Sequence, residues 1–576
     1  MLFRSLAYWL TASSLALASA IPASLIERQD GACTNTPRTR QCWSDGYSIS
    51  TDFDAKAPPA GTTVTYNFEI SNVTGPHPDG TAGTRQFHLI NGQYPGPVIR
   101  AKWGDTIVVN VKNSLRDNGT GIHWHGIRQL NSCQHDGVPG ITECPIAPGK
   151  TRQYRFKATQ FGTTWYHSHF SAQYGDGVLG TMIIDGPATV NYDIDLGVLP
   201  ITDYYYIPAS ILNEVAQHSS RGPPKPNNIL VNGTHVNENG KGSYAKMTVT
   251  KGKKYRIRII NTSMDSTFHV SLDKHPFTVM TADFVPIVPY VTDQLSIAVG
   301  QRYDVMVEAN QTVGNYWFRV GYGLDCGNNT ILSTGIQLGA IFSYTGAPNG
   351  NPKSTGVTLL TNCVDEDRFR LVPFVPNTVP SSIVGSAGKI DLKLGTADTG
   401  LVRWLLDGSA MIVDWNKPTL GTALMGSSDF YPNANLYELS TSNWYIWYIE
   451  STDSFQLPHP IHLHGHDFYV IGEGAGQWDG SASSLNLNNP TRRDTTTMPL
   501  KGYLVLAFPA DNPGAWVMHC HIAWHASQGL ALQFLERKGE ILKVIGDVSG
   551  GITGCNEWDG YWFPGNHPYN MTDSGI

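Results

Sequence analysis

Short runs of β-branched and aromatic residues, broken by Gly, Pro, Asn and Asp, recur along the whole chain. Clear examples are Thr106–Val111, Met247–Thr250 and Tyr503–Phe508. Runs of this length between turn residues are typical of strands in β-sandwiches and barrels. No long amphipathic helical pattern stands out, and the best helical candidate is the short segment His525–Gly529. The pattern therefore predicts an all-β fold.

Length and turn-rich segments divide this pattern into domains. A chain of 576 residues exceeds one ordinary domain, since a domain takes about 100 to 200 residues. Pro and Gly gather near residue 186 and again over residues 346–380, as is typical of loops between domains. We expect three domains, over residues 31–186, 187–371 and 372–576.

The N-terminus has the pattern of a secretory signal. Arg4 precedes the apolar stretch Leu6–Leu17, and the small residues Ala18–Ala20 follow, which predicts a signal peptide over residues 1–20. Residues 21–30 form a candidate propeptide. No other apolar run is long enough to span a bilayer, so we expect a secreted, extracellular protein. Seven sequons agree with secretion and are candidate glycosylation sites: Asn72, Asn118, Asn232, Asn261, Asn310, Asn328 and Asn570.

Composition argues against one class of partner. Charged residues make up 15% of the chain, against about 25% in a typical globular protein. The net charge is −7, and no basic run is present. Because nothing attracts a polyphosphate backbone electrostatically, we expect no nucleic-acid partner. We also expect no membrane partner and a monomer that acts on small molecules.

The chain has eight cysteines, and secretion allows them to form disulfides. Cys520 lies between two histidines, which indicates a metal thiolate rather than a crosslink. Seven cysteines then remain, so one more must be unpaired.

Histidines are concentrated near the two ends of the chain, and none of their clusters lies in the middle third. Side chains two apart in a strand point to the same face, and the residue between them points to the other. His519 and His521 therefore face one way and Cys520 the opposite way, so that three consecutive residues can serve two metal sites. The four clusters contain ten of the nineteen histidines: His123 and His125; His167 and His169; His459, His462 and His464; His519, His521 and His525.

The numbers of ligands favour copper over zinc. By strand parity, His459 joins Cys520 and His525 in a His₂Cys set, the donor combination of a blue-copper electron-transfer site. Eight histidines remain, and they suit three coppers with open positions where dioxygen can bridge. Zinc is the alternative, but structural zinc sites use four ligands and catalytic sites usually three.

The clusters, in this order, resemble the four copper-binding signatures of the multicopper oxidases, and their flanks resemble ascomycete laccases over nearly the whole mature chain. The resemblance implies three cupredoxin-like Greek-key domains and four copper ions. It implies that His123 and His462 bind the type 2 copper. Further shared motifs are Trp43–Gly46, Asn91–Pro97, Gly162, Trp165–His169, Asp203–Tyr206, Arg492–Asp494 and Asp573–Ile576. The type 3 pair would be bound by His125, His167, His169, His464, His519 and His521.

The activity that this resemblance implies is that of a laccase. A phenolic substrate, such as a p-diphenol or methoxyphenol, would lose one electron at a time to the type 1 copper, and O₂ would be reduced to water at the trinuclear cluster. The alternatives are an ascorbate oxidase or a ferroxidase-like enzyme. The resemblance implies that Leu530, ten residues after Cys520, takes the axial position of the type 1 site. Leucine cannot coordinate, which argues against the first. Ala523, where metal-oxidising relatives carry an acid, argues against the second.

The resemblance also implies roles around the coppers. Electrons would enter through His525 or His459, whichever ring edge reaches solvent. Asp265 would accept the proton of the phenol, and Asp136 would supply protons for oxygen reduction; a solvated loop acid and a turn residue are the alternatives. The apolar pocket wall would be Trp404, Phe455 and Leu457, which are otherwise ordinary core residues.

The tail and the disulfides complete these implications. Asp573, Ser574, Gly575 and Ile576 resemble a C-terminal plug that enters the channel to the trinuclear site; a frayed tail is the alternative. The implied disulfides are Cys33–Cys42, Cys144–Cys555 and Cys326–Cys363, with Cys133 left over. A Cys133–Cys555 pairing stays open from the sequence.

Overall fold

The structure is a computed structural model, and it describes residues 33–576 except 45, 220–221, 325, 327–334, 398–399, 452–456 and 564–571. The expected signal peptide, the candidate propeptide, Phe455, Asn328 and Asn570 lie outside the described residues. Almost all regular structure is β, in six larger sheets and one small two-stranded sheet. The predicted all-β fold is therefore confirmed.

The first third of the chain forms two four-stranded sheets around one core. Strand β8 alternates exposed and buried residues, as expected where one face meets solvent and the other meets the core. Strand β9, in contrast, is buried throughout, because β14 and β19 of the middle third pack against it. The first sheet has the order β4 (Thr84–Ile90), β3 (Thr63–Pro76), β6 (Thr106–Ser114), β8 (Thr151–Lys157), and the second β5 (Gly96–Lys102), β10 (Leu179–Asp185), β9 (Gly162–Ser168), β7 (Ile122–Trp124).

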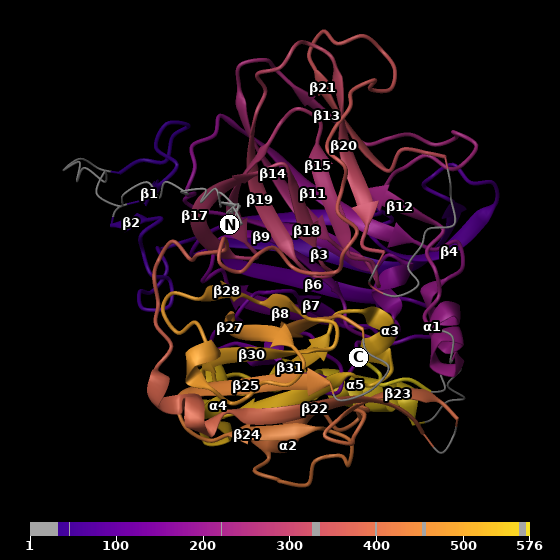
Figure 1. Ribbon diagram of the computed structural model, residues 1–576. Helices are drawn as coiled ribbons and strands as arrows, with labels where there is room; N and C mark the ends of the chain where they lie inside the picture. Colours follow the sequence, from indigo (N-terminus) through magenta and orange to yellow (C-terminus); the bar gives the residue numbers. More distant parts are fainter. Residues whose placement is uncertain are drawn as a thin grey trace, which may run out of the picture.

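The middle third forms a six-stranded and a five-stranded sheet, seen in the upper part of Figure 1. Its core is a separate cluster of aliphatic and aromatic residues. The six-stranded sheet has the order β12 (Asn228–Val231), β11 (Ile194–Tyr204), β14 (Lys254–Asn261), β19 (Arg302–Glu308), β16 (Phe277–Ala282), β17 (Val285–Thr292). The five-stranded sheet has the order β13 (Lys246–Val249), β21 (Gly339–Tyr344), β20 (Asn315–Tyr322), β15 (Phe268–Leu272), β18 (Gln294–Ile297).

The last third repeats this plan in the lower part of Figure 1. The six-stranded sheet has the order β23 (Val402–Leu406), β22 (Gly388–Thr396), β25 (Trp444–Ser451), β30 (Gly502–Pro509), β27 (Phe468–Ala475), β28 (Thr491–Arg493). The five-stranded sheet has the order β24 (Leu436–Leu439), β32 (Ala531–Glu536), β31 (Gly514–Cys520), β26 (His459–Leu463), β29 (Thr495–Met498). The predicted boundaries near 186 and 371 lie between β10 and β11 and between β21 and β22; the exact division stays a prediction.

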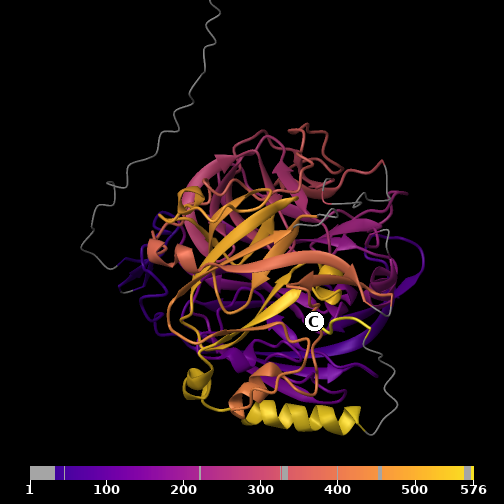
Figure 2. The ribbon, with the colours of Figure 1, turned by 60° about the horizontal axis from the view of Figure 1, so that its bottom comes forward.

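The helices differ from the sequence expectation. The helix predicted over His525–Gly529 is present but begins and ends two residues earlier, as α3 (Ala523–Ser527). Two longer helices were missed, α1 (Ala209–His218) and α5 (Ser549–Trp562). Four glycines in α5 hide its helical character, because glycine is a poor helix former. Figure 2 shows α5 as the yellow helix along the lower edge. The remaining helices are α2 (Thr419–Leu424) and α4 (Ile541–Ile545).

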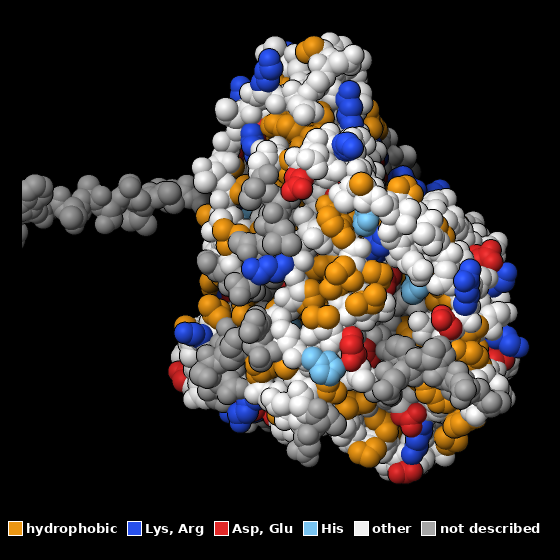
Figure 3. Space-filling model, turned by 90° about the vertical axis from the view of Figure 1, so that its right-hand side faces the viewer, with side chains coloured by type: hydrophobic (Ala, Val, Ile, Leu, Met, Phe, Trp, Pro, Cys, Tyr) orange, Lys and Arg blue, Asp and Glu red, His pale blue; other side chains and the backbone are white. Residues whose placement is uncertain are grey.

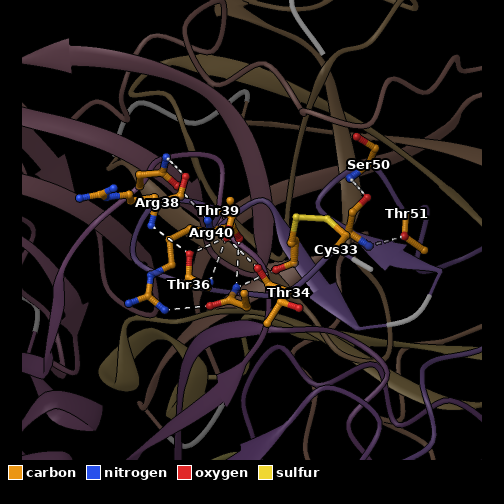
Figure 4. Close-up of a disulfide and its surroundings, with 12 residues drawn as sticks. Cys33, Thr34, Thr36, Arg38, Thr39, Arg40, Ser50 and Thr51 are labelled. Atoms are coloured by element: carbon orange, nitrogen blue, oxygen red, sulfur yellow. Dashed lines mark hydrogen bonds between the residues drawn. A yellow bond between two sulfur atoms is a disulfide. The ribbon is translucent and has the colours of Figure 1, made fainter. Parts of the chain in front are cut away.

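The structure forms the three disulfides that the family resemblance implies: Cys33–Cys42, Cys144–Cys555 and Cys326–Cys363. The second joins α5 to the first third of the chain, while Cys133 is free and buried. Figure 4 shows the first, which closes the N-terminal segment beside β1 (Cys42–Ser44) and β2 (Tyr47–Ser48). The neighbouring Arg40 donates from Nε to the Tyr192 carbonyl over 3.1 Å, so this segment is held against the connection between the first two thirds.

Candidate metal centres

Cys520 and two histidines form a compact triangle. Cys520 ends β31, His459 begins β26, which pairs with β31, and His525 lies on α3. The Cys520 Sγ atom lies 3.6 Å from Nδ1 of His459 and 3.6 Å from Nδ1 of His525, and the two Nδ1 atoms lie 3.2 Å apart. All three side chains are buried. The structure therefore brings together the predicted His₂Cys set.

Burial sets the protonation of this triangle. It lowers the pKa of His459 to about 3 and that of His525 well below its usual value, so both rings are neutral and each has a nitrogen lone pair to offer. Burial also raises the pKa of the Cys520 thiol. A buried thiolate is stable only beside a cation, and metal binding releases the proton of such a thiol. The donor set fits a soft metal ion.

The other eight histidines surround one point on the opposite face of β31. In register, His462 of β26 stands opposite His519 of β31. The Nε2 atom of His519 lies 3.4 Å from Nε2 of His169 and 3.4 Å from Nε2 of His464. Rings from the first and last thirds of the chain thus meet here. On the other side of the group, Nε2 of His521 lies 3.1 Å from Nδ1 of His125.

Most of these rings are held by the nitrogen that faces away from the centre. Nδ1 of His123 donates to the Asp136 carbonyl over 3.1 Å, Nδ1 of His462 to the Asp494 carbonyl over 2.7 Å, and Nδ1 of His167 to the Ser168 carbonyl over 3.0 Å. In all three the buried Nε2 has no hydrogen-bond partner among the described residues. A buried polar atom without a partner is costly in free energy. Because the Nε2 lone pairs of several rings point at one another, the partner that fits them all is a metal ion.

His125 is turned the other way. Its Nε2 lies 3.2 Å from Oδ1 of Asp494 and 3.3 Å from Oγ1 of Thr495, while Nδ1 faces His521. The carboxylate therefore holds the proton on Nε2 and leaves the lone pair on Nδ1. Asp494 was missed as a functional residue; its only signal was its place in the shared run Arg492–Asp494.

Asp136 is the predicted acid, and it lies among the histidines. Its side chain is buried, and Oδ2 accepts a hydrogen bond of 2.7 Å from Nδ1 of His464. Oδ1 lies 3.2 Å from Nδ1 of His123. One residue thus orients two rings from opposite ends of the sequence: the Asp136 carboxylate orients His464, and its backbone carbonyl orients His123.

A cavity of about 280 Å³ opens beside the cysteine centre. Trp404, Leu457 and His525 line it, whereas neither His459 nor Asp265 is among its lining residues. The Trp404 ring centre lies 4.8 Å from that of His525. Asp265 is 3% exposed, and its backbone N–H donates to Asp203. Of the two possible entry points for electrons, the structure thus places His525 at the cavity.

The cavity lies near a hydrophobic face of the molecule. Gln528 and His525 of its wall are close to α1, since Gln528 Nε2 donates to the Ala216 carbonyl of that helix over 2.9 Å. Ile211 and Val215 of α1 are more than half exposed. Figure 3 shows the side of the molecule that carries α1, with hydrophobic side chains gathered near its middle.

Leu530 lies in the same buried core cluster as Cys520, Trp404 and Ile461. Its carbonyl accepts from the Cys520 N–H over 3.1 Å, and its own N–H donates to the His525 carbonyl over 3.0 Å. The backbone of Leu530 therefore braces two members of the triangle, and its side chain is fully apolar.

The C-terminal residues enter the protein rather than solvent. Ile576 lines a small cavity together with His169 and His519. Asp573 accepts hydrogen bonds from Ser171 and from Nδ2 of Asn213, the latter over 2.7 Å. Two backbone bonds hold the turn: the Ser574 N–H donates to Ser527, and the Val413 N–H donates to Ser574. The tail is therefore ordered next to the eight-histidine centre.

One candidate glycosylation site is wrong. The Asn261 side chain is 0% exposed and donates both amide hydrogens, to the Ser266 and Ile297 carbonyls, over 2.8 Å each. No glycan fits there in the folded protein. Asn232 and Asn310 are exposed, and Asn72 and Asn118 are partly exposed, so these four stay predictions.

Comparisons with known proteins agree with this geometry. Multicopper oxidase family models match residues 76–189, 195–347 and 411–540. Laccase-1 of Melanocarpus albomyces is 46% identical over 568 residues, which cover 94% of this chain and 89% of that protein. Laccase-3 of Botryotinia fuckeliana is 50% identical over 457 residues, 76% of this chain and 100% of that one. The crystal structure of a laccase from Botrytis aclada superimposes with a TM-score of 0.88 at 40% identity, covering 95% of this chain and 100% of the other.

The chain belongs to the multicopper oxidase family. Within that family it is a laccase of the fungal type, a copper-dependent oxidoreductase with four copper ions, one of type 1, one of type 2 and two of type 3. Among the described residues, no helix is long and apolar enough to cross a membrane.

Proposed function

We propose that the two centres described above hold the four coppers of a phenol-oxidising laccase. The type 1 copper would be held by His459, Cys520 and His525, and the apolar Leu530, which cannot coordinate, lies in the same buried cluster. The type 2 copper is held by His123 and His462, and the type 3 pair by the other six histidines: His125, His167, His169, His464, His519 and His521. Bound copper supplies one-electron redox chemistry and the reduction of O₂ to water.

A single observation carries this assignment. Within three consecutive residues, the Cys520 Sγ lies 3.6 Å from two imidazole nitrogens on one face, while His519 lies 3.4 Å from two others on the opposite face. The backbone of β31 therefore joins an electron-accepting centre to an oxygen-reducing centre through a few covalent bonds. A protein that only stored copper would have no use for this junction.

The substrate side is the cavity at His525. Its apolar wall of Trp404, Leu457, Leu394 and Val402 suits an aromatic ring. We therefore assign phenols to this cavity. A phenol there need not bind the copper, because outer-sphere electron transfer needs proximity rather than a bond. Phe455, two residues before Leu457 in sequence, belongs to the same predicted wall.

Two carboxylates have proposed roles in proton movement. A phenol that loses an electron becomes a strong acid, and Asp265 is the proposed acceptor of its proton. Asp136 is the proposed proton donor for oxygen reduction, since its buried carboxylate lies among the eight histidines and accepts a hydrogen bond from Nδ1 of His464. The buried Ile576, with Asp573, Ser574 and Gly575, acts as a plug that limits access to the eight-histidine centre.

The setting of this chemistry is extracellular. The N-terminal pattern over residues 1–20 and the exposed sequons at Asn232 and Asn310 support secretion and glycosylation. We propose a monomer of three domains, over residues 31–186, 187–371 and 372–576, the last holding the type 1 copper.

Oxygen uptake by the purified, copper-loaded protein tests the function. A methoxyphenol, ascorbate and ferrous ion are supplied in parallel, and we expect uptake with the phenol to be the fastest. Uptake with ascorbate or ferrous ion but not with the phenol would refute the phenol assignment and leave another multicopper oxidase activity in its place.

A further inference from the structure

The middle third of the chain supplies no ligand, yet one of its loops touches the eight-histidine centre. The loop Ala298–Gln301 connects β18 to β19 and is buried throughout. A Cβ atom on Gly300 would lie 2.9 Å from Cδ2 of His521 and 3.0 Å from Cε1 of His125. Gly300 also has φ +86°, which favours glycine. The loop backbone therefore lies directly against two rings of the centre.

Arg302, which follows this loop, holds the carboxylate that orients His125. Its Nη1 donates to Oδ1 of Asp494 over 2.6 Å and its Nη2 to Oδ2 over 2.7 Å. Both side chains are 0% exposed. A bidentate, charge-assisted pair of this kind fixes the plane of the carboxylate as well as its position.

The guanidinium is itself held from the other sides. Nε donates to the Thr163 carbonyl over 3.1 Å, and Nη1 donates to the Gly300 carbonyl over 3.2 Å. The Arg302 N–H donates to Asp283 over 2.9 Å. Arg302 thus joins the first third of the chain, its own loop and Asp494 at one point.

Asp494, held in place by Arg302, orients two histidine rings. Its Oδ1 lies 3.2 Å from Nε2 of His125, and its carbonyl accepts from Nδ1 of His462 over 2.7 Å. His125 is the ring that presents Nδ1, rather than Nε2, to the centre, and only a partner at Nε2 can select that arrangement. Arg302 therefore acts on the ligand atom of His125 through Asp494.

We infer that Arg302 and Gly300 are positioning residues of the trinuclear copper site, contributed by the one domain that provides no ligand. Arg302 sets which nitrogen of His125 faces the metal, and Gly300 leaves room for the His125 and His521 rings to reach it. The inference rests on the ligand assignment proposed above.

The test compares R302K with R319K. Lysine keeps the charge but cannot form the planar two-point contact. Arg319 makes a similar bidentate pair with Asp273 in the same third of the chain, over 2.6 and 2.8 Å. Among the described residues, neither of the two hydrogen-bonds to one of the eight histidines. Loss of an outer partner typically costs about 10- to 100-fold in metal affinity or activity. We expect R302K to lose this much in kcat for oxygen uptake, with reduced copper content and an altered type 2 EPR signal, while the blue absorption of the Cys520 site persists.

Several outcomes would overturn the inference. One is an R302K variant whose copper content, type 2 EPR signal and kcat match those of R319K. If R302K fails to fold, G300A decides. Its added methyl presses on His125 and His521, both assigned to the type 3 pair, without removing a charge. Copper content and kcat that match those of wild type in folded G300A would contradict the inference. Failure of the ligand assignment itself is recognised separately, because wild type would then lack the type 2 signal or a C520S variant would keep the blue absorption.

Discussion

The two metal centres share one strand but have opposite surroundings. The cysteine centre is built entirely from the last third of the chain, within an apolar cluster that includes Leu530 and Trp404. The eight-histidine centre is built from both ends of the chain, and Asp136 and Asp494 hydrogen-bond to its rings. An electron-transfer site needs a rigid, dry environment that tunes its potential, whereas reduction of O₂ also consumes protons. Among the described residues, the carboxylates that hydrogen-bond to the rings thus belong to the centre that consumes protons.

The largest expected effect comes from removing the sulfur that joins the two centres. Cys520→Ser should abolish the blue absorption and lower oxygen uptake by well over about 100-fold, more than loss of an outer partner would cost. The type 2 EPR signal should persist, because its proposed ligands His123 and His462 lie on β7 and β26 and do not depend on the Cys520 sulfur. Retention of the blue band or of turnover would contradict the separation of the two centres.

A carboxylate of the oxygen-reducing centre is the next target. Asp136→Asn keeps the shape but removes the charge and the proton site beside His464, so kcat should fall about 10- to 100-fold. Substrate should still reduce the type 1 copper at its normal rate. The measurement is the rate at which the blue absorption disappears in the absence of oxygen. Slow bleaching in this variant would show that Asp136 also serves the cysteine centre.

The third prediction concerns the phenol proton. If Asp265 accepts it, Asp265→Asn should lower kcat/KM for a methoxyphenol by about 100-fold, the lower end for a general base. A substrate that loses an electron but no proton should be oxidised as before. Equal loss with both substrates would assign Asp265 a purely structural role, consistent with its burial and its bond to Asp203.

The smallest effect tests the apolar character of the cysteine centre. Leu530→Met offers a thioether at the axial position, which stabilises the cupric state and lowers the potential. A fall of about 60 mV would change the electron-transfer equilibrium roughly tenfold, measured by redox titration of the blue band. Leu530→Ile is the matched control, and a similar fall in that variant would exclude axial coordination as the cause.

Much of the fold and of the site could be predicted from local patterns. Strand runs and turn residues indicated an all-β chain, and the two-residue period of a strand was enough to place Cys520 on one face and His519 on the other. Helix α5 was missed because its glycines lower helix propensity, while its disulfide to Cys144 and its packing on β8 stabilise it. Asn261 looked like a glycosylation site because a sequon carries no information on burial.

The sequence by itself therefore determined the ligand types and their grouping, since the spacing of neighbours in a strand is a property of the backbone alone. Only the tertiary structure decided which partners reach those ligands. It placed His525 rather than His459 at the cavity, turned His125 by means of Asp494, and brought Gly300 and Arg302 against the histidines. These contacts join residues more than a hundred positions apart, and they depend on how three pairs of sheets pack, which no local pattern encodes.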